Sequence, residues 1–430
     1  MPAFIFQAKL QCGKNSREIS SMNLLIIGSG FSPVHHKLKA LGHRLFIIPD
    51  PSKKMPANEN GLYEAILFVH DVDHIEQLAI KICSDPILFN INRVIAFNEK
   101  WQLTATRVAS RTNLPIIIDE HLVNLTVDKY SMRKHLERAG VPSVKFEKIT
   151  HYHELADALH RIGFPAILKP LSGEASKDIY LIEDEFSYHQ IASALKNNFN
   201  EEFLLESFIY GDEYSVEAVS YQGQHHILAI TKKYKNKRFI ETGHVLPAPL
   251  AHELEEQIKT YIQKFLSVMN FNNCPSHTEI ILSNSGPVVI ESHTRPGGDN
   301  IYRLLEFSTG IDLMNIVAKI NTGTLEEEDI KRTKNQCHSA VWYSIPEGDS
   351  HFILEHIEGL EEARKIDHIE DITLLIQPGE NARHATNSFD RSAFAIATAP
   401  TASEALHSAQ HALSQIKFTY SYHSPKMEEN

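Results

Sequence analysis

The sequence predicts an α/β protein with a doubly wound parallel sheet at its N-terminal end and an α+β part with antiparallel strands after it. Apolar strand-like runs alternate with short helical segments from residue 22 to residue 97, an order typical of a parallel sheet with helices on both faces. Further along, apolar β-branched runs flank a Gly-containing turn at residues 283–286, as in an antiparallel hairpin. A chain of 430 residues is long enough for two or three domains.

Composition and charge exclude several classes of protein. Hydrophobic residues make up 42% of the chain and charged residues 22%, as in an ordinary globular protein. A net charge of −12 argues against nonspecific binding to nucleic acid or to an anionic membrane. No apolar run approaches the roughly 18 to 20 residues of a membrane helix. The four cysteines are widely spaced and form no CxxC pair, so we expect a cytoplasmic protein without a zinc site or a disulfide framework.

The first domain is expected over residues 22–125. Residues 1–21 lack the long apolar segment of a secretory signal, and they are either an extension or precede a true start at Met22. Gly28 and Gly30 follow the first strand, as in a dinucleotide-binding turn, but Pro33 and its neighbours stand where the third glycine should be. We therefore favour a tight strand-to-helix turn over a nicotinamide site. The expected strands cover residues 24–28, 44–48, 65–69 and 94–97, and the expected helices residues 36–41 and a segment ending at residue 80.

Three further parts are expected: residues 126–205, residues 206–325 and a C-terminal α+β subdomain at 326–430. Gly140 and Pro142 end a helix that starts near residue 131. The remaining expected strands cover residues 144–148, 166–169, 179–182, 203–209, 213–219, 340–343, 372–376 and 393–397, and the expected helices residues 153–162 and 403–416.

Glu279 and Glu291 are the most informative residues of the chain. Each lies within an apolar strand of the predicted hairpin, where a carboxylate is costly unless it has a cation or another partner. Two carboxylates that face one cleft suit Mg²⁺, which accepts carboxylate oxygens and usually bridges to phosphate. Arg295 follows four residues after Glu291, so the segment predicts a metal, a phosphate and a planar cation in one place.

A second group of residues suggests a phosphate and nucleotide cleft. Lys169 ends an apolar strand, where its ammonium group can lie over a phosphate. The alternative is that the aliphatic part of its side chain only covers apolar surface while the ammonium group faces solvent. The small residues that follow let backbone N–H groups approach phosphate oxygens, and Ser176 adds a hydroxyl. Glu206, Glu213 and Glu217 surround one Gly-containing turn, which favours a nucleotide cleft over a solvated edge, with Glu213 the best candidate for a ribose hydroxyl.

Residues 232–238 form a basic run, either a solvated loop or a lid that neutralises a triphosphate. Glu241 and His244 follow it. A glutamate and a histidine together can orient a substrate amine and stabilise a developing anion.

These segments, in this order, resemble the ATP-grasp superfamily over about residues 22–420. By that resemblance the fold is an ATP-grasp fold with a mobile central lid and a C-terminal antiparallel-sheet domain. The resemblance implies that ATP is bound by Lys129, Lys169, Ser176, Glu206, the backbone around Phe208, and Glu213. It also implies that Mg²⁺, with Mn²⁺ as the alternative, is bound by Glu279 and Glu291, and the phosphate by Arg295.

Within the superfamily, the segments around Glu241, Glu279 and Glu291 resemble L-amino acid ligases, which form dipeptides. In that family the glutamate and histidine equivalent to Glu241 and His244 lie at the amino-acid site. Two positions depart from the family. His293 replaces a metal-binding Asn, so it either binds the metal in its place or only lines the cleft. Asp299 follows Gly298 where the family can carry a bulky side chain, which would admit a cationic or amino-bearing substrate.

The family mechanism implies a carboxylate–amine ligase that acts through an acylphosphate and releases ADP and phosphate. Its substrates would be a small carboxylate and a small amine. The resemblance implies that the substrates are bound by Glu241, His244, Arg295, Gly298 and Asp299. Of these residues, Glu241, His244 and Arg295 would also take part in catalysis. The sequence does not determine the oligomeric state, and it is compatible with a homodimer. The alternatives are a purine-pathway or carboxylase-like ATP-grasp enzyme, a nucleotide-binding protein without catalysis, and a nicotinamide oxidoreductase.

Overall fold

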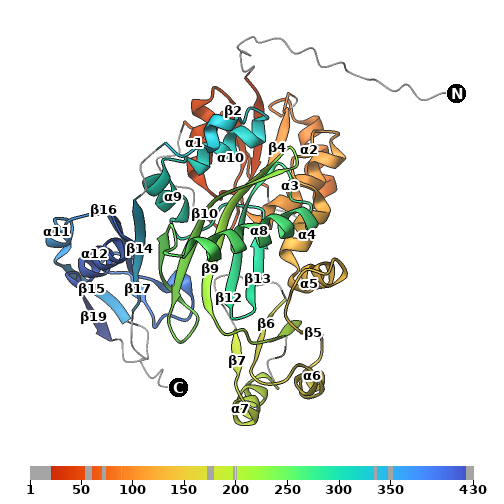
Figure 1. Ribbon diagram of the computed structural model, residues 1–430. Coiled ribbons are helices and arrows are strands. Elements are labelled where there is room, and N and C mark those ends of the chain that lie inside the picture. The colour runs from red at the N-terminus through yellow and green to blue at the C-terminus, as the bar shows by residue number, and fades with distance from the viewer. Residues whose placement is uncertain are drawn as a thin grey trace, which may run out of the picture.

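The computed structural model describes residues 21–53, 61–69, 74–88, 90–171, 179–196, 199, 201–333, 337–346 and 352–422 (Figure 1). The strands of this part of the chain form four sheets, of which the smallest has three strands. None of the described helices is both long and apolar enough to cross a bilayer.

The N-terminal domain is the predicted doubly wound sheet. Four parallel strands lie in the order β3 (Ala65–Ile66), β2 (Arg44–Ile48), β1 (Asn23–Ile27) and β4 (Arg93–Ile95). Alternate residues of β1 point to opposite faces and into different hydrophobic clusters, Leu24 and Ile26 on one side and Leu25 and Ile27 on the other. Both faces are therefore buried, as in a parallel sheet between two layers of helices. These helices are α1 (Ser32–Ala40), α2 (Ile75–Ser84) and α3 (Glu99–Arg111).

The turn after β1 serves packing. Gly28 has a φ of 83°, and a Cβ atom there would lie 2.0 Å from the ring of Trp101. The close approach of the Trp101 ring supports the interpretation of a tight turn at Gly28 rather than a nicotinamide site.

A separate four-stranded antiparallel sheet forms the central part. Its strands lie in the order β5 (Phe146–Ile149), β8 (Phe203–Ser207), β6 (Ala166–Pro170) and β7 (Tyr180–Ile182). Helices α6 (Leu155–Ile162) and α7 (Glu185–Leu195) accompany it, and Figure 1 shows the unit projecting from the rest of the molecule. A hydrophobic cluster from α6, α7 and the four strands gives the unit a core of its own. Helices α4 (Glu120–Val127) and α5 (Lys129–Arg138) connect it to the N-terminal domain.

The largest sheet has eight strands and runs through the catalytic core into the C-terminal part. Its order is β13 (Gly286–His293), β12 (Cys274–Ser283), β9 (Asp212–Tyr221), β10 (Gln224–Lys235), β11 (Glu241–Leu246), β14 (His338–Ser344), β18 (Ala393–Ala399) and β16 (Ile369–Leu374). The antiparallel pairing of β11 with β14 crosses the expected border at residue 325, and β8 spans the one at residue 205. The fold class is confirmed: an α/β protein with a parallel N-terminal sheet and antiparallel sheets after it.

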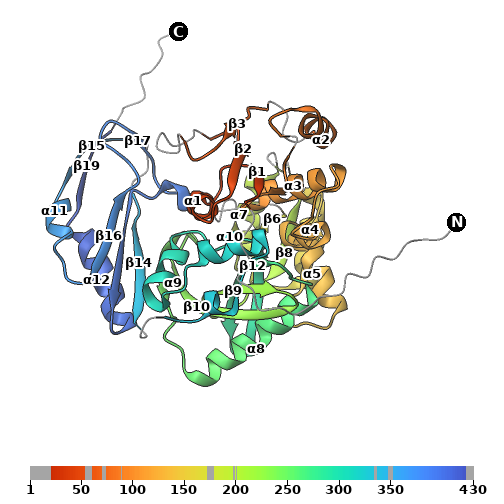
Figure 2. The same cartoon turned by 90° about the horizontal axis from the view of Figure 1, so that it is seen from above.

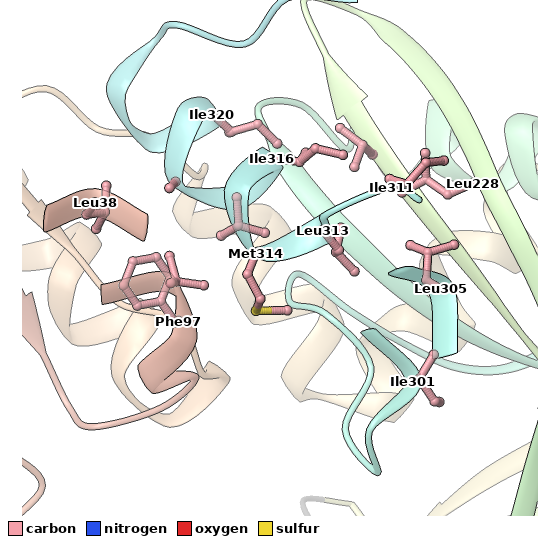
Figure 3. Close-up of a cluster of buried hydrophobic side chains, with 14 of the residues drawn as sticks. Leu38, Phe97, Leu228, Ile301, Leu305, Ile311, Leu313, Met314, Ile316 and Ile320 are labelled. Atoms are coloured by element: carbon pink, nitrogen blue, oxygen red, sulfur yellow. The ribbon is translucent and has the colours of Figure 1, made fainter. Parts of the chain in front are cut away.

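Helices cover the two faces of the large sheet. Helix α8 (His252–Val268) packs Ile258, Ile262 and Phe265 on one face, against strand residues such as Val216 and Ile280. Helices α9 (Ile301–Thr309) and α10 (Leu313–Thr322) pack between the large sheet and the N-terminal domain. Figure 3 shows Met314 of α10 facing Phe97 and Leu38 of the N-terminal domain, so one hydrophobic cluster joins the domain to the core.

The C-terminal part completes the molecule (Figure 2). Helix α12 (Ala402–Ser414) packs against β14 and β18, with the short helix α11 (Leu360–Ala363) beside it. A three-stranded sheet of β17 (Asn381–Ala382), β15 (Phe352–Glu358) and β19 (Lys417–Tyr422) lies beyond. The single-turn helices are η2 (Tyr152–Glu154), η3 (Glu327–Ile330) and η4 (Ser388–Asp390).

Candidate active site

The register of the large sheet gathers the predicted acids on one face. Glu279 of β12 is directly opposite Glu291 of β13, and His277 is opposite His293. Residues directly opposite each other in an antiparallel pair, and residues two apart in one strand, share a face. The next strand, β9, adds Glu217 opposite His277, so the hairpin and its neighbour carry a patch of charged side chains.

Each of the two predicted metal acids is paired with a lysine. Lys129 Nζ lies 3.1 Å from Glu291, and Lys233 Nζ contacts Glu279. Burial alone would raise the pKa of both carboxyl groups, but the lysine charges hold each pKa well below its usual range. Both acids are therefore ionised at neutral pH, in the form that binds a cation.

Lys169 is held by Glu206 rather than by solvent. Its Nζ atom lies 2.7 Å from Glu206, which also accepts a 2.6 Å hydrogen bond from the fully buried Arg133. Burial opposes ionisation of the Glu206 carboxyl, but the charges of Arg133 and Lys169 outweigh it and bring its pKa to about 2. Both oxygens of Glu206 thus hold cations in the described structure, so a contact between its side chain and ATP requires one of these bonds to change.

These groups line one cavity between the four-stranded sheet and the large sheet. Its charged lining includes Lys129, Lys169, Glu206, Glu213, Glu279 and Glu291, and its apolar lining includes Ile167, Phe208, Ile281 and Ile290. The predicted nucleotide residues therefore meet Glu279 and Glu291 in one place, except for Ser176, which lies outside the described residues. His293, the third predicted metal residue, does not line the cavity but lies 3.3 Å from Glu291. His244, Arg295 and Asp299 do not line this cavity.

The interpretation of residues 232–238 as a loop is wrong for Lys233. It lies within β10, its side chain is 1% exposed, and its Nζ is 2.8 Å from Glu241 and 3.4 Å from Glu213 in addition to its contact with Glu279. Burial would lower the pKa of Lys233, but the three carboxylates raise it well above its usual value. The buried ammonium group of Lys233 thus contacts three carboxylates with different predicted roles. Glu213 is predicted to bind the ribose, Glu241 the substrate amine and Glu279 the metal.

His293 bridges two parts of the chain. Its Nδ1 atom lies 2.6 Å from Glu99, the first residue of α3, and its Nε2 atom lies 3.3 Å from Glu291. Arg295 Nε is 3.9 Å from the same Glu99 carboxylate. Burial would lower the pKa of His293, but the charge of Glu99 raises it. The N-terminal domain therefore fixes the orientation of the imidazole that replaces the family asparagine.

His244 and Asp299 lie beside the C-terminal part. His244 Nε2 is 3.2 Å from Asp299, whose two oxygens also accept hydrogen bonds of 2.8 Å and 2.5 Å from Arg391. Burial would raise the pKa of Asp299, but these bonds hold it well below its usual range. In this structure Arg391 already neutralises the Asp299 carboxylate, and the expectation that Asp299 admits a cationic or amino-bearing substrate stays a prediction.

The glycine pair before Asp299 has two different roles. A Cβ atom at Gly297 would lie 2.8 Å from His277 Nδ1 and 3.0 Å from Glu217, so the close packing of these side chains requires glycine there. Nothing lies within 4 Å of a Cβ atom at Gly298, so its backbone faces open space.

The residues present fit a divalent cation that arrives with a nucleotide. Two ionised carboxylates directly opposite each other supply oxygen ligands, and Mg²⁺ commonly takes one or two carboxylates and completes its shell with phosphate and water. In the part of the chain that the structure describes, no three His, Cys, Asp or Glu side chains are already arranged as a metal site. The donor set is therefore that of a metal–phosphate site rather than of a closed protein cage.

Sequence reasoning missed several residues of the site, namely Glu99, Arg133, Lys233, His277 and Arg391. Lys233 stands among other lysines at residues 232–235, so no local pattern distinguishes it from a solvated residue. No local pattern marks Glu99 or Arg391, because each reaches the site from another domain.

Comparison with known proteins identifies the class. Residues 162–302 match the ATP-grasp domain family, and residues 353–421 match the family described as L-amino acid ligase C-terminal domain 2. The chain therefore contains an ATP-grasp domain, followed by the C-terminal domain described for L-amino acid ligases.

Individual relatives agree with this assignment. The chain is 26% identical over 336 residues to the alanine–anticapsin ligase of Bacillus amyloliquefaciens, which covers 69% of this chain and 70% of that protein. It is 30% identical over 217 residues to the alanine–anticapsin ligase of Bacillus subtilis strain 168, covering 45% of this chain and less than half, 46%, of that relative. The solved L-amino acid ligase of Bacillus licheniformis has the same fold, with a TM-score of 0.79, 20% identity, and coverage of 94% and 99% of the two chains.

Proposed function

We propose that this protein uses ATP to join the carboxylate of one amino acid to the amine of another, giving a dipeptide or dipeptide-like amide, ADP and phosphate. The observation that carries the proposal is the cavity in which Lys129, Lys169, Glu279 and Glu291 meet, next to the Glu241, His244 and Asp299 group. Such an arrangement supplies charges for a triphosphate and polar groups for an amino acid side by side. The relatives that are named as alanine–anticapsin ligases support an amino-acid substrate.

The nucleotide would occupy the cavity between the two sheets. Ile167, Phe208 and Ile281 would provide apolar surface for a planar base, and Glu213, which lines the same cavity, would accept a hydrogen bond from a ribose hydroxyl. Lys129 and Lys169 would exchange their carboxylate partners for phosphate oxygens. A divalent cation held by Glu279 and Glu291 would neutralise phosphate charge, and His293 is the candidate for a third ligand.

The chemistry would need positioning and charge more than a covalent nucleophile on the enzyme. The carboxylate oxygen of one amino acid attacks the terminal phosphorus of ATP, and the bond to ADP breaks. The amine of the second amino acid then attacks the acyl carbon, loses a proton, and phosphate leaves. Arg295 and His244 would stabilise the developing anion, and Glu241 would accept a hydrogen bond from an α-ammonium group. Closure of the four-stranded unit over the nucleotide would exclude water, which otherwise hydrolyses the acylphosphate.

A matrix of amino-acid pairs with ATP and Mg²⁺ tests the proposal, with nucleotide products separated by chromatography and amides detected by mass spectrometry. The expected result is one amide per ADP and phosphate. Stoichiometric AMP and pyrophosphate would reject the acylphosphate path. ADP formation that depends on a carboxylate without any amino-acid amide would favour the purine-pathway or carboxylase-like alternative, and no turnover at all would favour a binding protein.

A further inference from the structure

A charged clamp from the C-terminal part closes the proposed amino-acid subsite. The segment that contains η4 and Arg391 makes two contacts there. Arg391 pairs with Asp299 through its two terminal guanidinium nitrogens, Nη1 and Nη2, and Ser388 Oγ lies 3.1 Å from Glu241. The guanidinium carbon of Arg391 lies 3.8 Å from the centre of the Tyr343 ring, a cation–π contact that fixes the arginine from the other side.

The backbone holds Asp299 toward this clamp. Asp299 and Asn300 are consecutive non-glycine residues in the left-handed region, with φ values of 51° and 63°. This conformation is unfavourable for residues with a side chain, and it persists where surrounding interactions compensate for it. Arg391 and His244 supply those interactions, and Asn300 Nδ2 lies 3.4 Å from the Tyr343 hydroxyl.

Two polar atoms at this place are buried without a partner among the described residues. These atoms are Nε of Arg391 and Nδ1 of His244. The arginine is only 9% exposed and the histidine 1%. Buried polar atoms are nearly always hydrogen-bonded, so two without a partner beside Asp299 leave hydrogen-bonding capacity that a polar ligand would use.

The charges decide which ligand fits. Asp299 is matched by Arg391, and Glu241 is matched by Lys233 at 2.8 Å. A cationic side chain would meet a carboxylate whose oxygens are already in use and an arginine that repels it, and an anionic side chain would meet Asp299. A neutral side chain avoids both costs.

We propose that Arg391 is a specificity-determining residue of the amino-acid subsite, where it neutralises Asp299 and so selects amino acids with neutral side chains. This inference rests on the proposed function, since it places the amino acid beside Glu241 and His244. It gives the C-terminal domain a direct role in substrate choice, because Arg391 lies within residues 353–421.

Three variants of the full-length enzyme test the inference by a ratio of kcat/KM values rather than by activity alone. Wild-type protein and variants receive ATP, Mg²⁺, one fixed amine partner, and in turn alanine, glutamine, lysine or glutamate as the carboxylate partner. The wild type should prefer neutral amino acids. Arg391→Met should raise the ratio for lysine over glutamine at least tenfold, because it leaves the Asp299 charge unpaired. Asp299→Asn should raise the ratio for glutamate over glutamine by a similar factor, because it leaves Arg391 unpaired.

The double variant Arg391→Met/Asp299→Asn should return to a neutral preference. Circular dichroism and thermal melts identify variants that fail to fold, and Asp299→Asn, which keeps the arginine over Tyr343, tests the inference if Arg391→Met does not fold. Folded single variants with unchanged ratios would overturn the inference while amide synthesis by the wild type leaves the proposed function standing. If the wild type makes no amide from any pair, the proposed function and the inference fall together.

Discussion

The ammonium group of Lys129 lies 3.1 Å from the carboxylate of Glu291, so a predicted ATP ligand and a predicted metal ligand neutralise each other. Both side chains are largely buried, and a buried charge without a partner is costly. Arrival of a metal–nucleotide complex would give each a new partner of opposite charge, the phosphate for Lys129 and the cation for Glu291. The pairing balances the charge of both buried side chains.

Substitution of Glu291 tests this arrangement. Glu291→Gln should lower turnover by roughly 10² or more, because a positioned carboxylate–metal contact stabilises charge on the transferring phosphoryl group. The variant should fold, as judged by circular dichroism. Glu137→Gln, a change in an exposed pair with Lys134, is the matched control and should leave turnover unchanged. A Glu291→Gln enzyme with full ATP-dependent activity would remove the residue from the metal site.

Lys169→Met should raise the dissociation constant for ATP at least about tenfold, equivalent to ~1.4 kcal/mol. Folding should persist because Glu206 keeps its 2.6 Å bond to Arg133 after the lysine is lost. Calorimetric titration with a non-hydrolysable ATP analogue measures the effect. Lys148→Met, which alters a lysine of the same sheet that pairs with Glu202, is the control. Equal affinities of the two variants for the ATP analogue would show that Lys169 only packs against its neighbours and does not bind the nucleotide.

His293 should contribute a nitrogen ligand to the bound metal. Glu99 engages Nδ1, which leaves Nε2 on the side of Glu291, and a carboxylate behind a histidine is a common way to orient a metal ligand. Electron spin echo spectra of the Mn²⁺–ADP complex should show coupling to ¹⁴N of the protein. His293→Asn should abolish this signal, and Glu99→Gln should weaken Mn²⁺ binding by about tenfold or more. A spectrum that is identical in wild type and His293→Asn would place the imidazole outside the metal shell.

Stability should fall in mild acid because of His35, which lies in the N-terminal domain far along the chain from the proposed site. Its side chain is buried, Nδ1 is 2.6 Å from the Tyr63 hydroxyl, and burial lowers its pKa from 6.5 to about 4. The folded state therefore favours neutral His35, and stability is fully present above pH 6.5 and declines as pH falls toward 4. The loss is about 2 kcal/mol at pH 5. Urea unfolding at pH 7.5 and pH 5 should show a smaller difference in His35→Gln than in wild type; an equal difference would contradict the assignment.

The fold could be predicted largely because its strands are locally encoded. The strand at Arg44–Ile48 was predicted at its observed bounds, since a short run of buried apolar residues between turns has few alternatives. The strand expected at residues 65–69 shrinks to Ala65–Ile66, because only these residues pair with β2. The merging of the catalytic and C-terminal parts into one sheet depends on β11 pairing with a strand almost a hundred residues away, and no local pattern encodes such a pairing.

The site was predicted where a residue type is costly in its local context, and missed where partners come from afar. Glu279 and Glu291 stand out as acids in apolar strands. Their counter-ions do not: Lys233 belonged to a basic run that looked solvated, and Arg391 lies 92 residues from Asp299. The sequence therefore gives no sign that Arg391 neutralises Asp299, because the charge of a site is the sum over residues from every element packed against it.

The continuous hydrogen bonding from β13 to β16 has a mechanical consequence. Strands of one ladder cannot slide or hinge apart without breaking many backbone bonds at once, so Glu279 on β12 and Glu291 on β13 keep their spacing. Asp299 follows β13 and Arg391 precedes β18, so both sides of the clamp are attached to strands of this same sheet. The unit of β5, β6, β7 and β8 forms a separate sheet with its own core and is free of that constraint. Opening and closing would then change access to the nucleotide while the spacing between the reacting groups stays fixed, so substrate choice would not vary with the position of the lid.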